Sequence, residues 1–125
     1  MRLNLLLLLG GAFGTGCRYY LGLWFYSFVE RPVFPYANLV INVSGSFLMG
    51  VLAELFETRW VVPPEVRVAL LTGVLGGYTT FSSFAFETFG LLRDGEVGLA
   101  LLNAVGSVVL GLAAVWLGMR LAQAV

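Results

Sequence analysis

One stretch of the chain, GGYTTFSSFAFET from Gly76 to Thr88, combines residue types that could bind ions. Its two adjacent glycines permit the backbone to leave helical geometry, and a helix that unwinds inside a membrane frees carbonyl oxygens that can hold a small cation. The residues that follow set hydroxyl groups beside phenylalanine rings, whose edges are electropositive. Hydroxyl donors and ring edges could together contact a small anion without holding it too tightly. The stretch therefore has the chemistry of a cation site followed by an anion path.

The spacing after the glycines predicts two stripes on one helix. Thr80, Ser83 and Glu87 follow i, i+3 and i+7 and form a polar stripe. Phe81 and Phe84 follow i and i+3 on a second face. The opposing interpretation is a packing notch at the glycines, with threonines bonded back to their own helix and phenylalanines that face lipid. Spacing alone leaves both interpretations open.

Polar pairs at i, i+4 spacing lie in two other apolar segments: Asn38 with Asn42, and Asn103 with Ser107. An intramembrane asparagine commonly joins two helices through a hydrogen bond, so packing explains Asn38 and Asn103 as well as an ion path does. Two aligned pairs beside the polar stripe look more like a polar track. Asn42, Ser107 and Ser83 would supply its amide and hydroxyl donors.

Arg18 and Glu87 are charged residues well inside apolar segments, and charges at membrane depth are functional candidates. Arg18 would attract anions at a vestibule. A carboxylate repels anions unless it is protonated or paired, so Glu87 is a vestibule or gating candidate whose role the sequence does not define.

The composition places this chemistry in a membrane. Of 125 residues, 59% are hydrophobic and 11% are charged, against about 25% charged in ordinary soluble domains. Seven arginines balance seven acidic residues, so no net charge favours nucleic acid as a partner. The single Cys17 excludes an internal disulfide and a cysteine-based metal site. We predict an integral membrane protein of one domain, with the lipid bilayer as its surroundings.

Four apolar segments are long enough to cross a bilayer, which takes about 20 residues each. We predict a single all-α transmembrane domain over residues 1–125, with a third helix that breaks near residues 76–80. The four expected helices cover about residues 3–29, 36–55, 66–92 and 97–119.

The first residues, MRLNLLLLLGGAFGTGC, have the basic start, leucine run and small residues of a lipoprotein signal. Gly14 stands where such signals prefer leucine, and the apolar run resumes after Arg18 as YYLGLWFYSFV. We therefore expect this segment to remain in the protein as its first helix.

The arginines give little preference for one orientation. The side with both termini carries four of them, and the other side carries two, with Arg18 inside the first segment towards that side. Arginine distribution usually sets orientation in the membrane. Because the difference between the two sides is small, both insertions are credible, and the chain could assemble as an antiparallel, dual-topology homodimer. Small residues such as Gly10 and Gly14, in GxxxG spacing, predict close helix contacts.

Three motifs resemble one family, the Fluc (CrcB) fluoride channels. GGYTTFSSF resembles the family signature GGxTTFSTF, GAFGTGCRYYL is similar to its first-span motif GAxxGAxxRY, and NLVINVSGSFLMG resembles TLxVNxxGxFxxG. The resemblance covers essentially the whole chain. This sequence departs from the family at Ser83, where threonine is common, at Asn38, where threonine is usual, and at Asn103, where some members have tyrosine.

The resemblance implies a dual-topology homodimer with two antiparallel fluoride pores, each lined by both subunits. By motif position, Phe81 and Phe84 face the ion, Asn42 is the pore asparagine, and the carbonyls of Gly76 and Thr79 hold a central structural sodium ion. The remaining expected pore residues are Thr80, Ser83 and Ser107.

The sequence therefore predicts a fluoride-selective channel that exports fluoride by passive diffusion across the bacterial cytoplasmic membrane. One alternative is a proton-coupled small multidrug exporter, but such proteins carry a glutamate in the first span, where this chain has Arg18 and no acidic residue. A membrane assembly subunit would explain the glycines but not the polar stripe. An enzyme is not expected, because the sequence has no histidine and no nucleophile–base pair.

Overall fold

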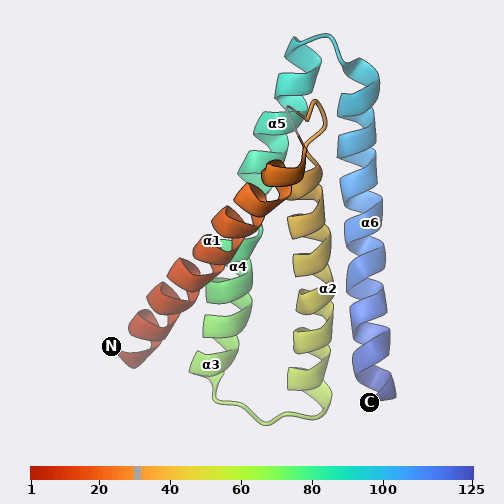
Figure 1. Cartoon of the computed structure of the whole chain (residues 1–125). Coiled ribbons are helices and arrows are strands. Elements are labelled where there is room, and N and C mark those ends of the chain that lie inside the picture. The colour runs from red at the N-terminus through yellow and green to blue at the C-terminus, as the bar shows by residue number, and fades with distance from the viewer. Residues whose placement is uncertain (30–31) are drawn as a thin grey trace.

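The structure, a computed structural model, describes residues 1–29 and 32–125. These residues form helices joined by short loops, and none of them lies in a strand. The prediction of an all-helical protein is confirmed. The elements are α1 (Arg2–Phe28), α2 (Tyr36–Thr58), α3 (Pro64–Val68), the π-helix η1 (Ala69–Leu75), α4 (Gly76–Tyr78), α5 (Phe81–Arg93) and α6 (Val97–Ala124) (Figure 1).

Three helical segments in the described part of the chain are long and apolar enough to cross a membrane: Tyr36–Thr58, Pro64–Arg93 and Val97–Ala124. The multi-pass membrane prediction is confirmed to that extent. The 27-residue α1 is also long enough, at about 1.5 Å per residue, but polar residues, Arg18 among them, interrupt its apolar run. Its membrane crossing stays a prediction.

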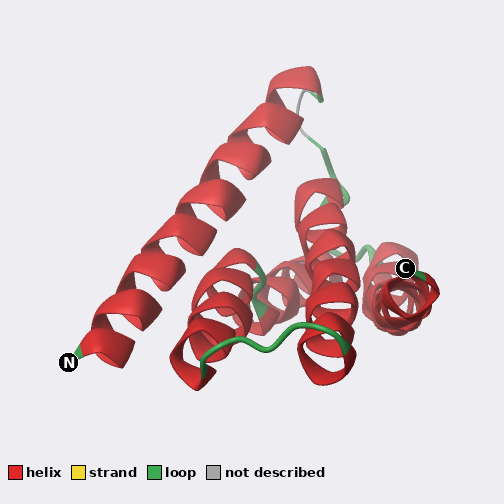
Figure 2. Ribbon diagram, turned by 90° about the horizontal axis from the view of Figure 1, so that it is seen from below, coloured by secondary structure: helices red, strands yellow, loops and turns green. Residues whose placement is uncertain are grey.

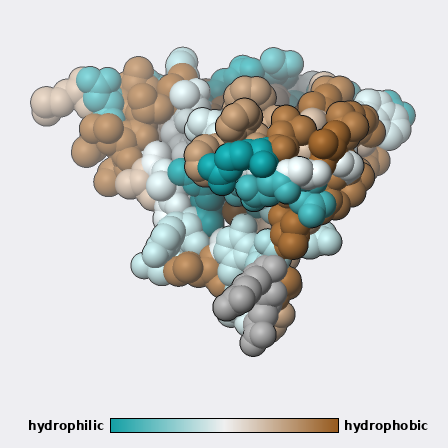
Figure 3. Space-filling view, turned by 90° about the horizontal axis from the view of Figure 1, so that it is seen from above, coloured by the Kyte–Doolittle hydropathy of each residue, from teal (hydrophilic) through white to brown (hydrophobic). Residues whose placement is uncertain are grey.

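Prolines and one glycine mark the helix boundaries. Pro35 precedes the first turn of α2, and Pro64 opens α3, where a missing N–H costs no helical hydrogen bond. Between α5 and α6 the chain reverses through Gly95, whose φ of 83° lies in the region that glycine adopts most easily. Hydrophilic surface forms a band across this end of the molecule, with apolar surface beside it (Figure 3).

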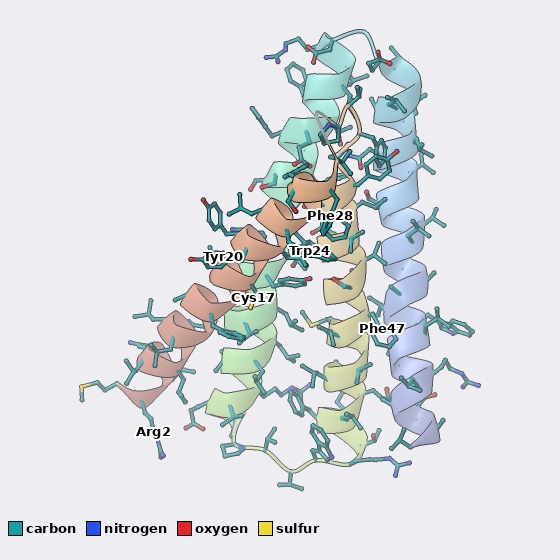
Figure 4. The ribbon with its side chains drawn as sticks, in the orientation of Figure 1. Arg2, Cys17, Tyr20, Trp24, Phe28 and Phe47 are labelled. Carbon is teal, nitrogen blue, oxygen red and sulfur yellow. The ribbon has the colours of Figure 1, made fainter. Side chains whose placement is uncertain are left out.

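The helices α1 and α6 lie at opposite edges of the bundle, with α1 inclined to the rest (Figures 1 and 2). α2 packs along α6 through glycines: a Cβ on Gly50 would overlap the Val115 carbonyl, and one on Gly118 would overlap the Phe47 carbonyl. Small residues here allow two backbones to touch. The side chain of Phe47 lies between these two helices (Figure 4).

The third segment is interrupted at Thr79 and Thr80, which are extended at φ −99°, ψ 154° and φ −152°, ψ 126°. Gly76 and Gly77, expected to unwind the helix, are helical instead. Gly77 serves close packing, because a Cβ there would lie 2.6 Å from the Gly11 carbonyl oxygen of α1. The β-branched threonines, which favour extended backbone, form the break.

Candidate functional site

A chain of hydrogen bonds joins the break to α2 and α5. The Thr80 N–H donates to Asn42 Oδ1 at 3.3 Å, Asn42 Nδ2 donates to Asn38 Oδ1 at 3.2 Å, and Asn38 Nδ2 donates to Glu87 Oε2 at 2.7 Å. The i, i+4 spacing on α2 and the i, i+7 spacing on the third segment turn these groups towards each other. These four residues, all candidates from the sequence, therefore form one connected network between α2 and the third segment.

A second set of hydrogen bonds joins α5 to α6. Ser107 Oγ donates to Asn103 Oδ1 at 3.3 Å, Asn103 Nδ2 donates to Thr88 Oγ1 at 2.8 Å, and Thr88 Oγ1 donates to the Phe84 carbonyl at 2.7 Å. Asn103 is only 2% exposed, and a buried amide needs such partners. Asn103 thus links two helices in this chain, which is the packing interpretation that its spacing left open beside an ion path.

A cavity of about 230 Å³ lies beside the break and receives side chains from α2, α5 and α6. We call it the phenylalanine cavity. It collects five of the six residues expected in a pore, and Ser83 is the one it lacks. Its lining residues are Asn42, Ser46, Thr79, Thr80, Phe81, Phe84, Ser107 and Val108.

The two phenylalanine rings lie at the outer side of this cavity. Their centroids are 5.6 Å apart and their planes are inclined by 47°. Phe81 is 79% exposed and Phe84 is half-buried. The ring side of the phenylalanine cavity is therefore largely uncovered at Phe81.

A second cavity, of about 330 Å³, lies between α1, α2 and α5. We call it the arginine cavity. Arg18 and Glu87 both line it, although the ion pairs found among the described residues lie elsewhere, at more exposed positions. Ser83 lines this cavity, and Thr80 lines both cavities. The sequence identified both charged residues, but it could not place α1 against α5.

The break also leaves backbone groups without their helical partners. The Thr80 N–H, which would bond the Gly76 carbonyl in a continuous helix, donates to Asn42 instead. Thr79 is extended, so its carbonyl also leaves the helical direction. Neutral carbonyl oxygens at an unwound helix suit a small cation such as sodium. In the described residues, no group of three or more His, Cys, Asp or Glu side chains could hold a metal ion.

The other side of the break is the N-terminus of α5. The side chain of its N-cap, Thr80, does not cap the backbone N–H groups of the first turn, and its hydroxyl lies 3.0 Å from the Ser82 hydroxyl instead. The first N–H groups of a helix carry a partial positive charge that favours anions. The break thus turns carbonyl groups to one side and N–H groups to the other.

Two residues close to the break were not selected from the sequence as functional. Tyr78 OH lies 2.9 Å from Ser44 Oγ of α2. Ser44 belongs to the run of small residues in NVSGSFLMG, which predicts packing only, and Tyr78 has no periodic partner in the sequence. Only the contact between the two helices identifies them.

The chain is similar to known proteins over almost its whole length. The profile of a family described as "CrcB-like protein, Camphor Resistance (CrcB)" matches residues 5–119. A protein of Geotalea daltonii named fluoride-specific ion channel FluC is 46% identical over 113 residues, which are 90% of each chain. A protein of the same name from Geobacter metallireducens is 47% identical over 90% of both chains. Another, from Solibacter usitatus, is 47% identical over 95% of this chain and 97% of the relative.

Proposed function

The chain belongs to the CrcB-like family, and from this premise we infer that it is a fluoride-selective ion channel that exports fluoride from the cytoplasm by passive diffusion. The family is one of ion channels and not of enzymes, and the export relieves fluoride toxicity. The multidrug alternative has no support from these relatives, which are fluoride channels by name.

The observation that carries the proposed pathway is the phenylalanine cavity beside the break. A fluoride ion is small and strongly hydrated, so a pore must replace its water with other donors. Asn42, Thr80 and Ser107 supply amide and hydroxyl groups there, and ring edges of Phe81 and Phe84 add weak positive potential. Among the described residues, no full cation lines this cavity, which would keep binding weak enough for the ion to leave.

The working unit that we propose is an antiparallel homodimer with two pores. The open ring side supports this arrangement, because Phe81 is 79% exposed and the neighbouring Ser82 is exposed as well. The hydroxyl groups of Thr80 and Ser82 share one hydrogen bond, so among the described residues one of their two protons has no partner, which is costly in hydrocarbon. A second copy, inserted in the opposite direction, would cover this face and complete the wall of each pore.

A structural sodium ion at the dimer centre is the cofactor that we propose. The carbonyl groups of Gly76 and Thr79 would hold it, since both leave the helical hydrogen-bond pattern. Two carbonyls from one copy are few for a cation, and a second copy would double them. When bound, the ion would supply a fixed positive charge that ties the two subunits together.

The arginine cavity is the proposed vestibule. Arg18 would draw anions towards it, and the hydrogen bond from Asn38 to Glu87 holds the carboxyl group in place. Thr80 would connect it to the phenylalanine cavity, because it lines both.

The proposed location is the bacterial cytoplasmic membrane. Tyr20 and Trp24 are exposed at i and i+4 of α1 (Figure 4), and tyrosine and tryptophan are enriched where a bilayer meets water, which supports a membrane location.

Liposomes loaded with fluoride and read with a fluoride electrode test the function. We expect rapid fluoride efflux once charge is compensated, and little chloride movement. Phe81→Ile or Phe84→Ile should remove about nine-tenths of the fluoride flux or more, because an aliphatic side chain has no electropositive edge. Phe89→Ile is the matched control, since Phe89 is an exposed phenylalanine of α5 that lines neither cavity. Efflux that needs a pH gradient, or that survives both pore changes, would contradict the proposal.

A further inference from the structure

The hydrogen bond between Tyr78 and Ser44 has a defined direction. Ser44 Oγ donates to the Ile41 carbonyl at 3.1 Å and lies 2.9 Å from Tyr78 OH. A serine hydroxyl has one proton, and the Ile41 carbonyl receives it. The Tyr78 phenol is therefore the donor to Ser44, and the phenol proton has a partner inside the membrane-spanning part of the chain.

The surface of α2 is shaped to admit this residue. Gly45, which follows Ser44, is buried, and a Cβ there would lie 3.2 Å from Tyr78 Cδ1 and would overlap Thr79 Cγ2. The missing side chain lets Tyr78 and Thr79 approach the α2 backbone. The contact is thus built from both helices and is more than a chance meeting of two hydroxyl groups.

The break is attached to α2 on both of its sides. Tyr78, the last residue of α4, is held by Ser44, and the Thr80 N–H is held by Asn42 Oδ1. Thr79 lies between these two attachments, and its own hydroxyl donates to the Leu75 carbonyl at 3.0 Å. With residues on either side fixed to one rigid helix, the direction of the Thr79 carbonyl is restricted.

Neither Tyr78 nor Ser44 lines the phenylalanine cavity or the arginine cavity. Any effect of this pair on ions must therefore act through the residues that it holds. We propose that Tyr78 and Ser44 are positioning residues: their hydrogen bond fixes the Thr79 carbonyl and so sets how tightly the break holds its sodium ion. This inference rests on the fluoride channel and the sodium site proposed above.

The test replaces sodium by a large organic cation at constant ionic strength and measures two quantities: fluoride efflux from liposomes, and the unfolding temperature of the purified protein, which a bound ion raises. We expect Tyr78→Phe and Ser44→Ala each to raise the sodium concentration for the half-maximal change in both quantities by about fivefold, the size expected from one net hydrogen bond. Because both changes remove the same bond, the double variant should shift no further than either single one. Ser44→Thr, which keeps the hydroxyl, should restore the wild-type value.

The matched controls are Tyr20→Phe and Ser27→Ala. Tyr20 is exposed on α1, and Ser27 donates to the Trp24 carbonyl of its own helix, far from the break, so both changes should leave the sodium response unchanged. A sodium response that is unchanged in Tyr78→Phe and Ser44→Ala, or a double variant with additive shifts, would overturn the inference while wild-type efflux still supports the channel. Efflux independent of sodium would overturn the inference together with the sodium site, and absence of wild-type efflux would overturn the proposed function itself.

Discussion

The two sides of the break in the third segment are built in opposite ways. Before the break, η1 and α4 touch α1 backbone to backbone, through glycines on both helices. After the break, α5 joins its neighbours mainly through side-chain hydrogen bonds and leaves most of its aromatic rings uncovered. The exposed residues of this half include Phe81, Ser82, Ser83, Phe86 and Phe89.

This difference separates two tasks within one membrane crossing. Close backbone contact fixes the first half, because packing and not hydrophobicity holds helices together in lipid. The second half keeps its donors and rings available for the fluoride ion and the second copy of the chain that we propose. A break between the halves permits both, since α5 need not follow the path that the glycine contacts set for α4.

The largest effect should follow from a side chain placed in the glycine contact. A Cβ on Gly14 would overlap the Val74 carbonyl and lie 2.9 Å from the Tyr78 nitrogen, and neither backbone atom can rotate away. We expect Gly14→Ala to lower the free energy of unfolding by about 3 kcal/mol, as overpacking does, or to prevent folding. Thermal unfolding and the yield of monodisperse protein in detergent measure this change.

Gly16→Ala, two positions further along α1, is the control. A Cβ there meets nothing within 4 Å, and alanine is about 1 kcal/mol better than glycine inside a helix. This variant should therefore be as stable as the wild type or slightly more so. Equal stability of Gly14→Ala and Gly16→Ala would show that the first half of the segment is not held by backbone contact.

An intermediate effect should follow at Asn42, the α2 residue that holds the Thr80 side of the break. Asn42 accepts from the Thr80 N–H and donates to Asn38, and it lines the phenylalanine cavity. We expect Asn42→Ala to lower fluoride efflux about tenfold, because an ion loses a donor and the break loses an attachment. Stability should fall by only about 1–2 kcal/mol, the cost of unpaired polar groups.

Asn42→Asp separates the two roles of this residue. It keeps an acceptor for the Thr80 N–H but loses the donor to Asn38, so stability should fall about as much as in Asn42→Ala. A negative charge beside the rings should in addition repel fluoride and stop efflux, where Asn42→Ala only lowers it. Efflux in Asn42→Asp equal to that of the wild type would mean that the ion does not pass Asn42.

The features that could be predicted from the sequence are those set by local patterns. Apolar runs and prolines define the helices, and the i, i+4 pairs on α2 and α6 do face the third segment, as the bonds of Asn38 and Asn103 show. The exact site of the break could not be predicted, because the role of Gly77 depends on Gly11 of a distant helix. The π-helix η1 could not be predicted either, because no local residue pattern indicated it.

The candidate site divides in the same manner. Asn42, Phe81 and Phe84 line one cavity, and their roles towards the ion stay a prediction. Ser83 does not line this cavity, because helical spacing places it with Thr80 and Glu87, and these three residues line the arginine cavity together. The sequence predicted that stripe, but it could not predict that α1 would line the same cavity, because that placement joins segments distant in the sequence.

The smallest effect should come from Ser83. Its hydroxyl lines the arginine cavity and is absent from the phenylalanine cavity. We expect Ser83→Ala to lower efflux by about twofold, because one water-accessible donor is lost where water can replace it. Ser107→Ala should lower efflux further, since Ser107 lines the phenylalanine cavity. The ratio of the two efflux rates, measured in the same liposome assay, ranks the two sides of α5. If Ser83→Ala reduced efflux as strongly as Phe81→Ile, the narrow part of the pathway would pass the arginine side of α5, and the exposed ring face would belong to the dimer contact alone.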